Sequence, residues 1–142
     1  MQVFTPYLKP FFCAECLDPR RRNKQIIECR QILAAIRNES PYWKNHPVTK
    51  QYTNHVDYLE NYMKCFEHYK AGDIALAMYY SDKAMQCKPD FLTLEFCNQH
   101  KRRLYTKDEV KYYRFYKYGK SQENWYYVDG KLIKYINGRI IK

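Results

Sequence analysis

The spacing of apolar residues changes once along the 142-residue chain, near residue 120, and this change limits the folds available to it. Before that point apolar side chains recur at helical spacing, whereas after it come three short β-prone runs, residues 125–128, 131–136 and 139–141. These runs are separated by two dipeptides that favour two-residue hairpin turns, Asp129-Gly130 and Asn137-Gly138. We therefore predict a mainly α fold, with a compact helical domain over residues 1–120 and a small C-terminal β-meander over residues 121–142 packed on the same domain.

Capping residues and helix breakers divide the predicted helical domain. Asp18 is a good N-cap and Pro19 a good first residue for a helix that ends near Asn38. Further helices are expected from about Pro47 to Gly72, from Ile74 to roughly Met85 after a cap at Asp73, and, as a short one, from Asp90.

Aromatic residues fall into two groups with different expected roles. Helical spacing predicts that Tyr58, Tyr62 and Phe66 lie in the core rather than act as stacking platforms. A second group follows Thr106-x-x-Glu109, a capping box that predicts a helical start for this segment, with a stop at Gly119. This group includes Tyr112, Tyr113 and Tyr116, which cannot all face inward because they are near neighbours.

The net charge of +10 is concentrated in the C-terminal third of the chain. Residues 1–100 carry 13 basic and 11 acidic side chains, whereas residues 101–142 carry 12 basic and 4 acidic ones. Clustered cations interleaved with aromatic side chains suit a polyanion whose bases can stack, which indicates nucleic acid. The alternative, a solvated basic tail, is less consistent with the many aromatic residues there, because disordered tails are poor in them.

The remaining composition indicates an intracellular protein. No apolar run approaches the ~18 residues that a membrane span needs, and Pro6, Lys9 and Pro10 interrupt the N-terminus, unlike a secretory signal. We expect a cytoplasmic protein (nucleoid-associated, or in the host cytoplasm if viral), with no membrane contact and no obligate protein partner. Its six cysteines are then expected to be free thiols: Cys13, Cys16, Cys29, Cys65, Cys87 and Cys97.

No metal or cofactor is expected. Cys13-x-x-Cys16 has no second pair at zinc-finger spacing. A zinc site that adds histidine ligands is the minor alternative, and its candidates are His46, His55, His68 and His100.

One carboxylate stands inside the basic helix that begins at Pro19. Between Pro19 and Asn38 the only acid is Glu28, among six cations: Arg20, Arg21, Arg22, Lys24, Arg30 and Arg37. At about 100° per residue, Glu28 falls in a stripe beside the buried face of the helix, together with Arg21, Lys24 and Gln31. Burial would raise its pKa and the cations would lower it, so the net direction stays open. The plain alternative is an i, i+4 surface ion pair with Lys24.

Three blocks of sequence carry a family resemblance that spans roughly residues 1–120. The first is Leu17-Asp18-Pro19-Arg20-Arg21-Arg22-Asn23-Lys24-Gln25-Ile26-Ile27-Glu28, and the second is Trp43-Lys44-Asn45-His46-Pro47. The third is Arg103-x-x-x-Lys107 followed by Tyr112-Tyr113-Arg114-Phe115-Tyr116. In this order the blocks resemble the phage-type pyrimidine-dimer DNA glycosylases, also called the endonuclease V type.

The resemblance implies a compact helical fold and a bifunctional DNA repair enzyme. Members of the family remove the 5′ pyrimidine of a cyclobutane dimer through an imine on their own α-amine, and then cleave the backbone by β-elimination. By position, the family's helix glutamate is Glu28, Arg21 and Gln25 line the cleft, and Arg103 and Lys107 bind phosphate. An α-amine titrates near ~8, so a useful fraction of it is a neutral nucleophile at physiological pH.

The resemblance also sets the expected site and partner. The nucleophile is expected to be the α-amine of Met1, or that of Gln2 if Met1 is removed, and the partner is damaged double-stranded DNA. The expected DNA-binding residues are Arg20, Arg21, Arg22, Lys24, Gln25, Arg103, Lys107, Tyr112, Tyr113, Arg114 and Tyr116. Two alternatives remain, which are a lyase acting on another damaged base and a non-catalytic DNA-binding protein that keeps the scaffold.

Overall fold

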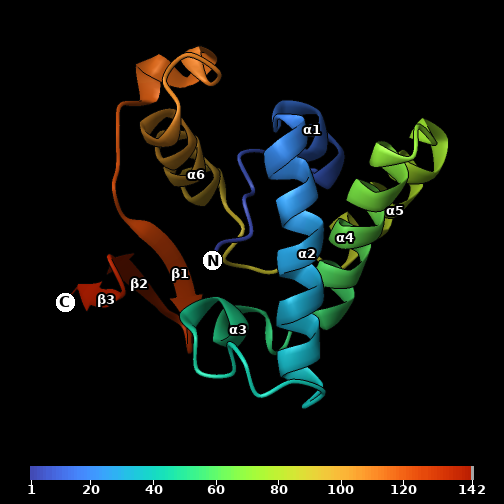
Figure 1. The fold of residues 1–142 in the computed structure, drawn as a ribbon, viewed down its shortest axis with the longest axis horizontal. Helices are drawn as coiled ribbons and strands as arrows, with labels where there is room; N and C mark the ends of the chain where they lie inside the picture. The colour runs from blue at the N-terminus through green and yellow to red at the C-terminus, as the bar shows by residue number, and fades with distance from the viewer. Residues whose placement is uncertain (142) are drawn as a thin grey trace.

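A computed structural model describes residues 1–141, and its central element is α2, Pro19–Ile36. The helix begins as predicted, since Pro19 is its first residue and the Asp18 side chain accepts a hydrogen bond from the Arg21 amide. It runs through the middle of the molecule, with α4 and α5 on one side and α6 and the C-terminal sheet on the other (Figure 1). This central position lets one helix contribute to both the core and an open face.

The remaining helices of the N-terminal part pack around α2. Contacts join α4 to α2 and α5, and join α1 to α4. Their bounds are α1 Pro10–Cys16, α3 Pro47–Tyr52, α4 Val56–Lys70 and α5 Ile74–Gln86. The Asp73 side chain caps α5 by accepting from the Leu76 amide, as predicted.

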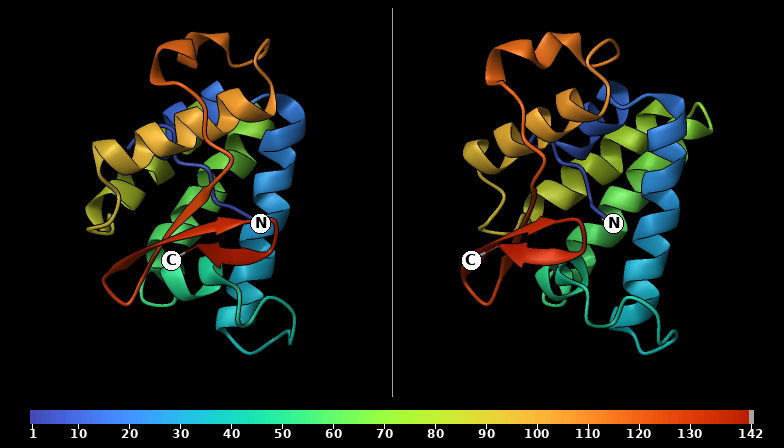
Figure 2. Two further views of the ribbon diagram at one scale, coloured as in Figure 1. Left: turned by 90° about the vertical axis from the view of Figure 1, so that its left-hand side faces the viewer. Right: turned by 60° about the vertical axis from the view of Figure 1, so that its left-hand side comes forward.

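The chain ends in α6, Leu94–Lys107, a 3-10 helix η1, Tyr113–Tyr118, and the predicted β-meander. Its antiparallel strands lie in the order β1-β2-β3, with bounds β1 Asn124–Val128, β2 Lys131–Ile136 and β3 Arg139–Ile141. Both hairpin turns have positive φ at the predicted dipeptides, for example 52° at Asp129 and 74° at Gly130. The sheet lies beside α3 and the chain's N-terminus (Figure 2), and β1 contacts α3 and α6.

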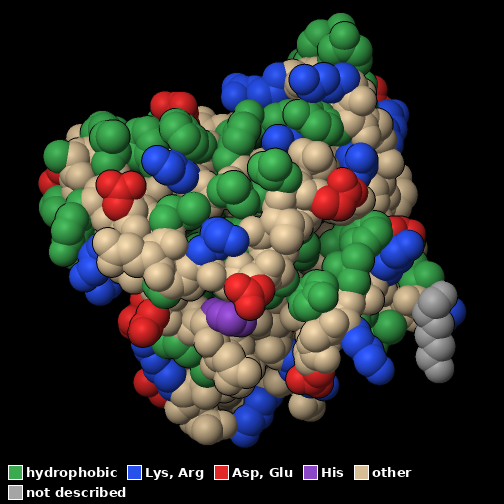
Figure 3. Space-filling view, turned by 180° about the vertical axis from the view of Figure 1, so that it is seen from behind, with side chains coloured by type: hydrophobic (Ala, Val, Ile, Leu, Met, Phe, Trp, Pro, Cys, Tyr) green, Lys and Arg blue, Asp and Glu red, His purple; other side chains and the backbone are tan. Residues whose placement is uncertain are grey.

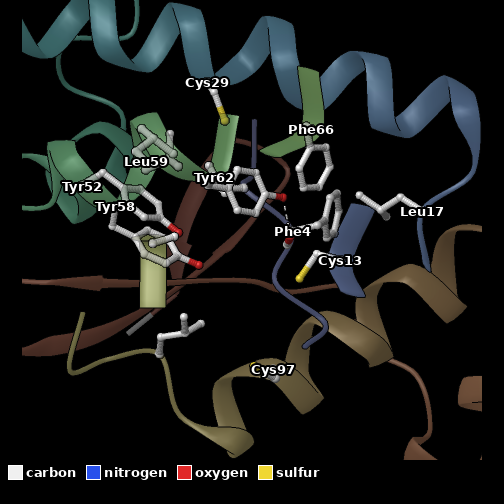
Figure 4. Close-up of a cluster of buried hydrophobic side chains, with 14 of the residues drawn as sticks. Phe4, Cys13, Leu17, Cys29, Tyr52, Tyr58, Leu59, Tyr62, Phe66 and Cys97 are labelled. Carbon is white, nitrogen blue, oxygen red and sulfur yellow. Dashed lines mark hydrogen bonds between the residues drawn. The ribbon is translucent and has the colours of Figure 1, made fainter. Parts of the chain in front are cut away.

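The core is rich in tyrosine. Tyr58, Tyr62 and Phe66 of α4 are fully buried, as their spacing predicts, and Tyr62 stacks on Phe66 at 4.5 Å. Figure 4 shows them among Phe4, Leu17 and buried thiols from three different elements. Burying each large side chain contributes about 2–3 kcal/mol. Because the tyrosines extend toward the first residues of the chain, the core also fixes the N-terminus.

Three details of the predicted helices are wrong. The predicted helix from Pro47 to Gly72 is two helices, α3 and α4, separated near Asn54. The predicted short helix from Asp90 is the long α6, which begins at Leu94 because Thr93 caps it. Thr106 does not open a new helix, because it lies inside α6 and its hydroxyl donates to the Arg102 carbonyl.

Some simpler expectations are confirmed. Gly119, with φ of 85°, ends η1, and the six cysteines of the described chain are free thiols. Within residues 1–141, no helix combines the length and the hydrophobicity needed to cross a membrane.

Candidate functional site

A polar pocket of about 310 Å³ opens where the N-terminus meets α2, the end of α6 and the start of β1. It is lined by Met1, Gln2, Phe4, Arg20, Arg21, Lys24, Gln25, Glu28, Lys107, Asp108, Lys111 and Asn124. The chain's N-terminus lies at the centre of the arrangement of α2, α6 and β1 in Figure 1. The pocket thus joins residues that are more than 100 positions apart in sequence.

The Gln25 side chain holds the first residues of the chain against α2. Its Nε2 donates to the Gln2 carbonyl at 2.9 Å and to Glu28 Oε2 at 3.2 Å. Its Oε1 accepts from the Phe4 amide at 2.9 Å and lies 3.0 Å from the Tyr62 hydroxyl. With these partners in a buried setting, this amide is a rigid support for the chain terminus.

Further contacts fix the same segment from two other directions. The Tyr126 hydroxyl of β1 donates to the Met1 carbonyl, and Tyr62 donates to the Phe4 carbonyl at 2.6 Å. On α6, His100 Nδ1 accepts from the Thr5 amide at 2.7 Å, and burial lowers the pKa of this histidine to about 3. His100 is therefore neutral at physiological pH and serves as an acceptor.

Glu28 is the buried carboxylate of this pocket, with an exposed fraction of 7%. Burial raises its pKa, although the Met1 amine and Lys24 oppose the shift. Among residues 1–141 its one ion-pair partner is Lys24, at 3.9 Å and with an exposed side chain. The predicted i, i+4 pair therefore exists, but it is not a surface pair, because the carboxylate belongs to the pocket.

The α-amine of Met1 faces the same pocket. Burial lowers its pKa, Glu28 acts in the opposite direction, and the cations Lys24, Lys107 and Arg103 lower it further. Burial thus moves the amine toward the neutral, nucleophilic form and Glu28 toward the protonated form. A neutral amine beside a carboxyl group that can give and take a proton is suited to imine chemistry.

Cations from α2 and from the end of α6 surround this pair. Arg20, Arg21 and Lys24 line the pocket from α2, Lys107 lines it from the end of α6, and Lys111 lines it from the segment that follows. Burial and the neighbouring cation Arg103 lower the pKa of Lys107. Asp18 pairs with both Arg21 and Lys111, and the lining that remains is still net positive, which attracts phosphate groups. The face of the molecule in Figure 3 shows no such concentration of positive charge. Acidic and basic side chains are interspersed on it, and hydrophobic side chains gather over its upper part.

Two other predicted DNA-binding residues, Arg103 and Arg22, form hydrogen bonds within the protein. Arg103 lies behind the pocket wall, where its Nε donates to Asn124 Oδ1 at 3.0 Å. Arg22 does not line the pocket, because its guanidinium donates to the Ala14 and Leu17 carbonyls, each at 2.8 Å, and covers the Tyr69 ring. Its predicted contact with DNA stays a prediction.

The predicted aromatic residues lie apart from the pocket, at η1. Tyr112 is buried and its hydroxyl donates to Asp18 Oδ1, so it ties this segment to the start of α2. Tyr113 and Tyr116 are 65% and 58% exposed and stack on each other at 5.2 Å. Arg114 lies beside them with an exposed side chain. The roles of these four residues in DNA binding also stay predictions.

Sequence reasoning missed several residues of the site. Lys111 and Asn124 line the pocket, and Tyr126 holds the Met1 carbonyl. Lys111 had a usable signal, since it follows Lys107 by four residues in the basic region. The other two had none, because they come from a β-strand whose docking beside the N-terminus is a long-range event.

His46 lies near the pocket, and it also lines a second groove between the segment 41–50 and the C-terminal meander. Its Nδ1 accepts from the Val48 amide at 3.1 Å and caps α3, and its ring meets the edge of the Tyr126 ring at 5.5 Å. Burial and the nearby Met1 amine lower its pKa to about 4. His46 thus caps α3 and packs against the residue that holds the Met1 carbonyl.

The described residues do not assemble a metal centre. Over residues 1–141, no group of three or more His, Cys, Asp or Glu side chains is arranged to hold a metal ion. The four histidines considered as zinc ligands are thus not brought together with cysteine thiols in this part of the chain.

The comparison with known families agrees with the resemblance in the sequence. The family described as pyrimidine dimer DNA glycosylase matches residues 1–68, which include Met1, Gln25 and Glu28. No curated protein and no solved structure shows a significant match to the chain. The match confirms the predicted family for this N-terminal part and supports a DNA repair glycosylase.

Proposed function

We propose that this chain, whose residues 1–68 match the pyrimidine dimer DNA glycosylase family, is a glycosylase and abasic-site lyase that acts on cyclobutane pyrimidine dimers. One observation carries the proposal: a half-buried α-amine and a buried carboxylate face a single pocket whose lining is rich in cations. The amine is the nucleophile, Glu28 moves protons, and the cations hold the phosphates of damaged double-stranded DNA.

In the first step, the N-terminal amine displaces the damaged base from C1′ of the sugar. The neutral amine attacks C1′ of the sugar, the glycosidic bond breaks, and the pyrimidine leaves with the bonding electrons and the proton that the amine loses. Glu28 in its acid form then protonates O4′ as the sugar ring opens, which gives a protonated imine between C1′ and the amine. The raised pKa of Glu28 favours the acid form that this step requires.

The second step breaks the backbone. The Glu28 carboxylate, now ionised, removes a proton from C2′, and the C3′–O bond breaks with its electrons leaving on the 3′ phosphate. The developing negative charge on that phosphate is stabilised by the cations that line the pocket, among them Lys107 and Lys111. Water then hydrolyses the imine and releases the amine. No step in this sequence uses a metal or a cofactor.

The contacts around the N-terminus favour Met1 over Gln2 as the source of the amine. The Met1 carbonyl accepts from Tyr126 and the Gln2 carbonyl accepts from Gln25, so both first residues have defined partners. Removal of Met1 would leave the Tyr126 hydroxyl without this acceptor. The Gln2 nitrogen also faces Glu28, so a trimmed chain would still present an amine to the carboxylate.

Borohydride trapping on a duplex with one abasic site tests this function. Reduction of the imine should join protein and DNA covalently, and mass spectrometry of the adduct peptide should place the link at the α-amine of residue 1 or 2. An adduct at an internal lysine would contradict the assigned nucleophile. Binding of the duplex without any adduct would favour the non-catalytic DNA-binding protein.

Lesion specificity needs a separate measurement. Cleavage should be faster on a duplex with one cyclobutane dimer than on matched duplexes that carry another damaged pyrimidine or none. Trapping on abasic DNA without cleavage of the dimer would keep the lyase and assign it to a different damaged base.

A further inference from the structure

A second groove, of about 1360 Å³, runs between the segment 41–50 and the C-terminal meander. One wall includes Trp43, Lys44 and Lys50, and the other is formed by β2, β3 and their turns. The meander lies beside α3 and the N-terminus in both views of Figure 2. None of the predicted catalytic or DNA-binding residues, all of which lie within residues 1–141, lines this groove.

The charge of the groove is strongly positive. Its side chains include four exposed cations, Lys44, Lys50, Lys131 and Arg139, and one carboxylate, Asp129. Within residues 1–141, none of these cations forms an ion pair. Positive charge that acidic side chains do not neutralise is free to bind phosphates.

Between the cations the groove offers apolar and aromatic surfaces. Leu132 and Ile140 are 45% and 56% exposed, and Tyr135 lies beside His46 at a ring distance of 5.5 Å. Duplex DNA presents phosphates and base edges, whereas an unpaired strand also presents the faces of its bases. Cations alternating with such surfaces therefore suit a single strand.

Trp43 is held in an unusual backbone conformation at the mouth of the groove. Its φ is 65°, in the left-handed region that a bulky residue seldom adopts, and its side chain is 43% exposed. The Thr49 hydroxyl donates to its carbonyl at 2.6 Å and keeps the turn in place. Backbone strain maintained by the surrounding structure, with an aromatic ring left half-exposed, is typical of functional surfaces.

The groove is adjacent to the pocket, and a short chain of contacts separates the two. The Met1 carbonyl accepts from Tyr126, the Tyr126 ring meets His46, and His46 lines the groove. Burial and the Met1 amine both lower the pKa of His46. The groove is therefore a neighbouring surface for a nucleic acid that is held at the amine.

We propose that the groove binds an unpaired DNA strand that extends from the lesion. The inference rests on the proposed function for the position of the lesion, and it gives the predicted meander of residues 121–142 a role in holding DNA. A strand opened from the duplex at the pocket places its phosphates on the four cations and its bases against Trp43 and the apolar floor. This contact keeps the duplex open while the amine reacts.

Fluorescence anisotropy with a fluorescein-labelled oligothymidylate tests the groove directly. Two paired variants reverse charge on opposite walls, Lys131→Glu/Arg139→Glu on the meander and Lys44→Glu/Lys50→Glu on the other side. Each pair should weaken binding by at least about tenfold and lower the slope of log affinity against log salt by about 1.4, since each lost contact contributes about 0.7 for single strands. Trp43→Ala should weaken binding about tenfold with the slope unchanged.

The matched control is Lys70→Glu/Lys83→Glu, which makes the same change in net charge on α4 and α5. These helices lie on the other side of α2 in Figure 1. If the control pair weakens oligothymidylate binding as much as the groove pairs do, the effect depends on net charge alone and the proposal is wrong. Wild-type protein that binds oligouridylate far more tightly, through the same residues, would make the groove an RNA site and overturn the DNA assignment.

Thermal melting of each variant shows whether it folds, and the two pairs on separate walls guard against a single unstable one. Borohydride trapping by the wild-type protein is measured in parallel on a blunt abasic duplex. Absence of trapping overturns the proposed function alone, whereas wild-type failure to bind oligothymidylate overturns the groove assignment alone.

Discussion

Tyrosines and cations occur together in two regions of this molecule, the pocket and η1, but their surroundings differ. Beside the pocket, Tyr62 and Tyr126 are buried, and their hydroxyls donate to the Phe4 and Met1 carbonyls. On η1, Tyr113 and Tyr116 have exposed rings that stack on each other. Residue type alone therefore does not determine what a tyrosine does in this molecule. Buried tyrosines position the terminus, and exposed ones are available to contact a ligand.

The sharpest test of the pocket is to lengthen the chain at its N-terminus. An uncleaved extension of a few residues converts the Met1 amine to an amide, which is not nucleophilic, and crowds a site where Met1 is half-buried. Trapping and strand cleavage should be abolished, while DNA binding is largely retained. The same tag placed after Lys142 is the control. Full activity with a verified, intact N-terminal tag would disprove the assigned nucleophile.

The next largest effect is expected for Glu28→Gln. The change keeps the size of the side chain but removes its ability to exchange a proton, so turnover should fall by about 10² or more. Affinity for damaged DNA should hold or rise, because a negative charge among phosphate-binding cations is lost. Single-turnover cleavage of a duplex with one dimer measures the effect.

Glu15→Gln is the matched control for that change, because Glu15 is an exposed acid of α1 outside the pocket. It should leave cleavage unchanged. If Glu28→Gln behaves like this control and alters only thermal stability, Glu28 is no more than a partner of Lys24.

Gln25→Met tests whether the anchoring of the terminus matters for the chemistry. It removes the hydrogen bonds of the Gln25 amide to Gln2, Phe4 and Glu28, and should lower cleavage about tenfold and stability by about 1–3 kcal/mol. A looser, better-solvated amine should have a higher pKa, so the midpoint of trapping against pH should move upward. Gln31→Met, at an exposed position of α2, is the control. A large loss of stability with an unchanged pH midpoint would show a purely structural role.

A smaller effect is expected on η1. Tyr113→Ala or Tyr116→Ala should weaken binding to damaged DNA by up to about tenfold if bases stack on these rings, and should leave single-turnover cleavage at saturating DNA unchanged. Anisotropy titration and saturating cleavage separate these quantities. Tyr105→Ala, at a half-buried position of α6, controls for the simple loss of an aromatic ring. If both η1 variants bind damaged DNA with unchanged affinity, the stacked rings of Tyr113 and Tyr116 do not contribute to DNA binding.

Local signals in the sequence predicted the elements better than they predicted the site. Asp18-Pro19 and the two turn dipeptides are short-range signals, so α2 and the meander were confirmed within a residue or two. Glu28 was placed correctly beside the buried face of α2, but its burial depends on the N-terminal segment and on α6, which no local pattern reveals. Tyr126 and Asn124 reach the site by tertiary packing alone, and Thr106 was misassigned because a capping-box pattern also fits inside a helix.

The smallest expected effect concerns Asp18, which connects the two regions. Burial raises the pKa of this carboxylate, but hydrogen bonds from Tyr112 and Arg21 outweigh burial and lower the pKa to about 2. Because the folded-state pKa is below the ordinary value of 3.8, the stabilisation is complete above about pH 5 and is lost as the pH falls toward 2. Asp18→Asn should therefore cost about 1 kcal/mol at pH 7 and almost nothing near pH 2. Urea unfolding of both proteins across this range measures the difference.

Asp57→Asn, which changes an exposed acid in the first turn of α4, is the control. A cost for Asp18→Asn that does not change with pH would mean that shape, rather than charge, joins η1 to the start of α2.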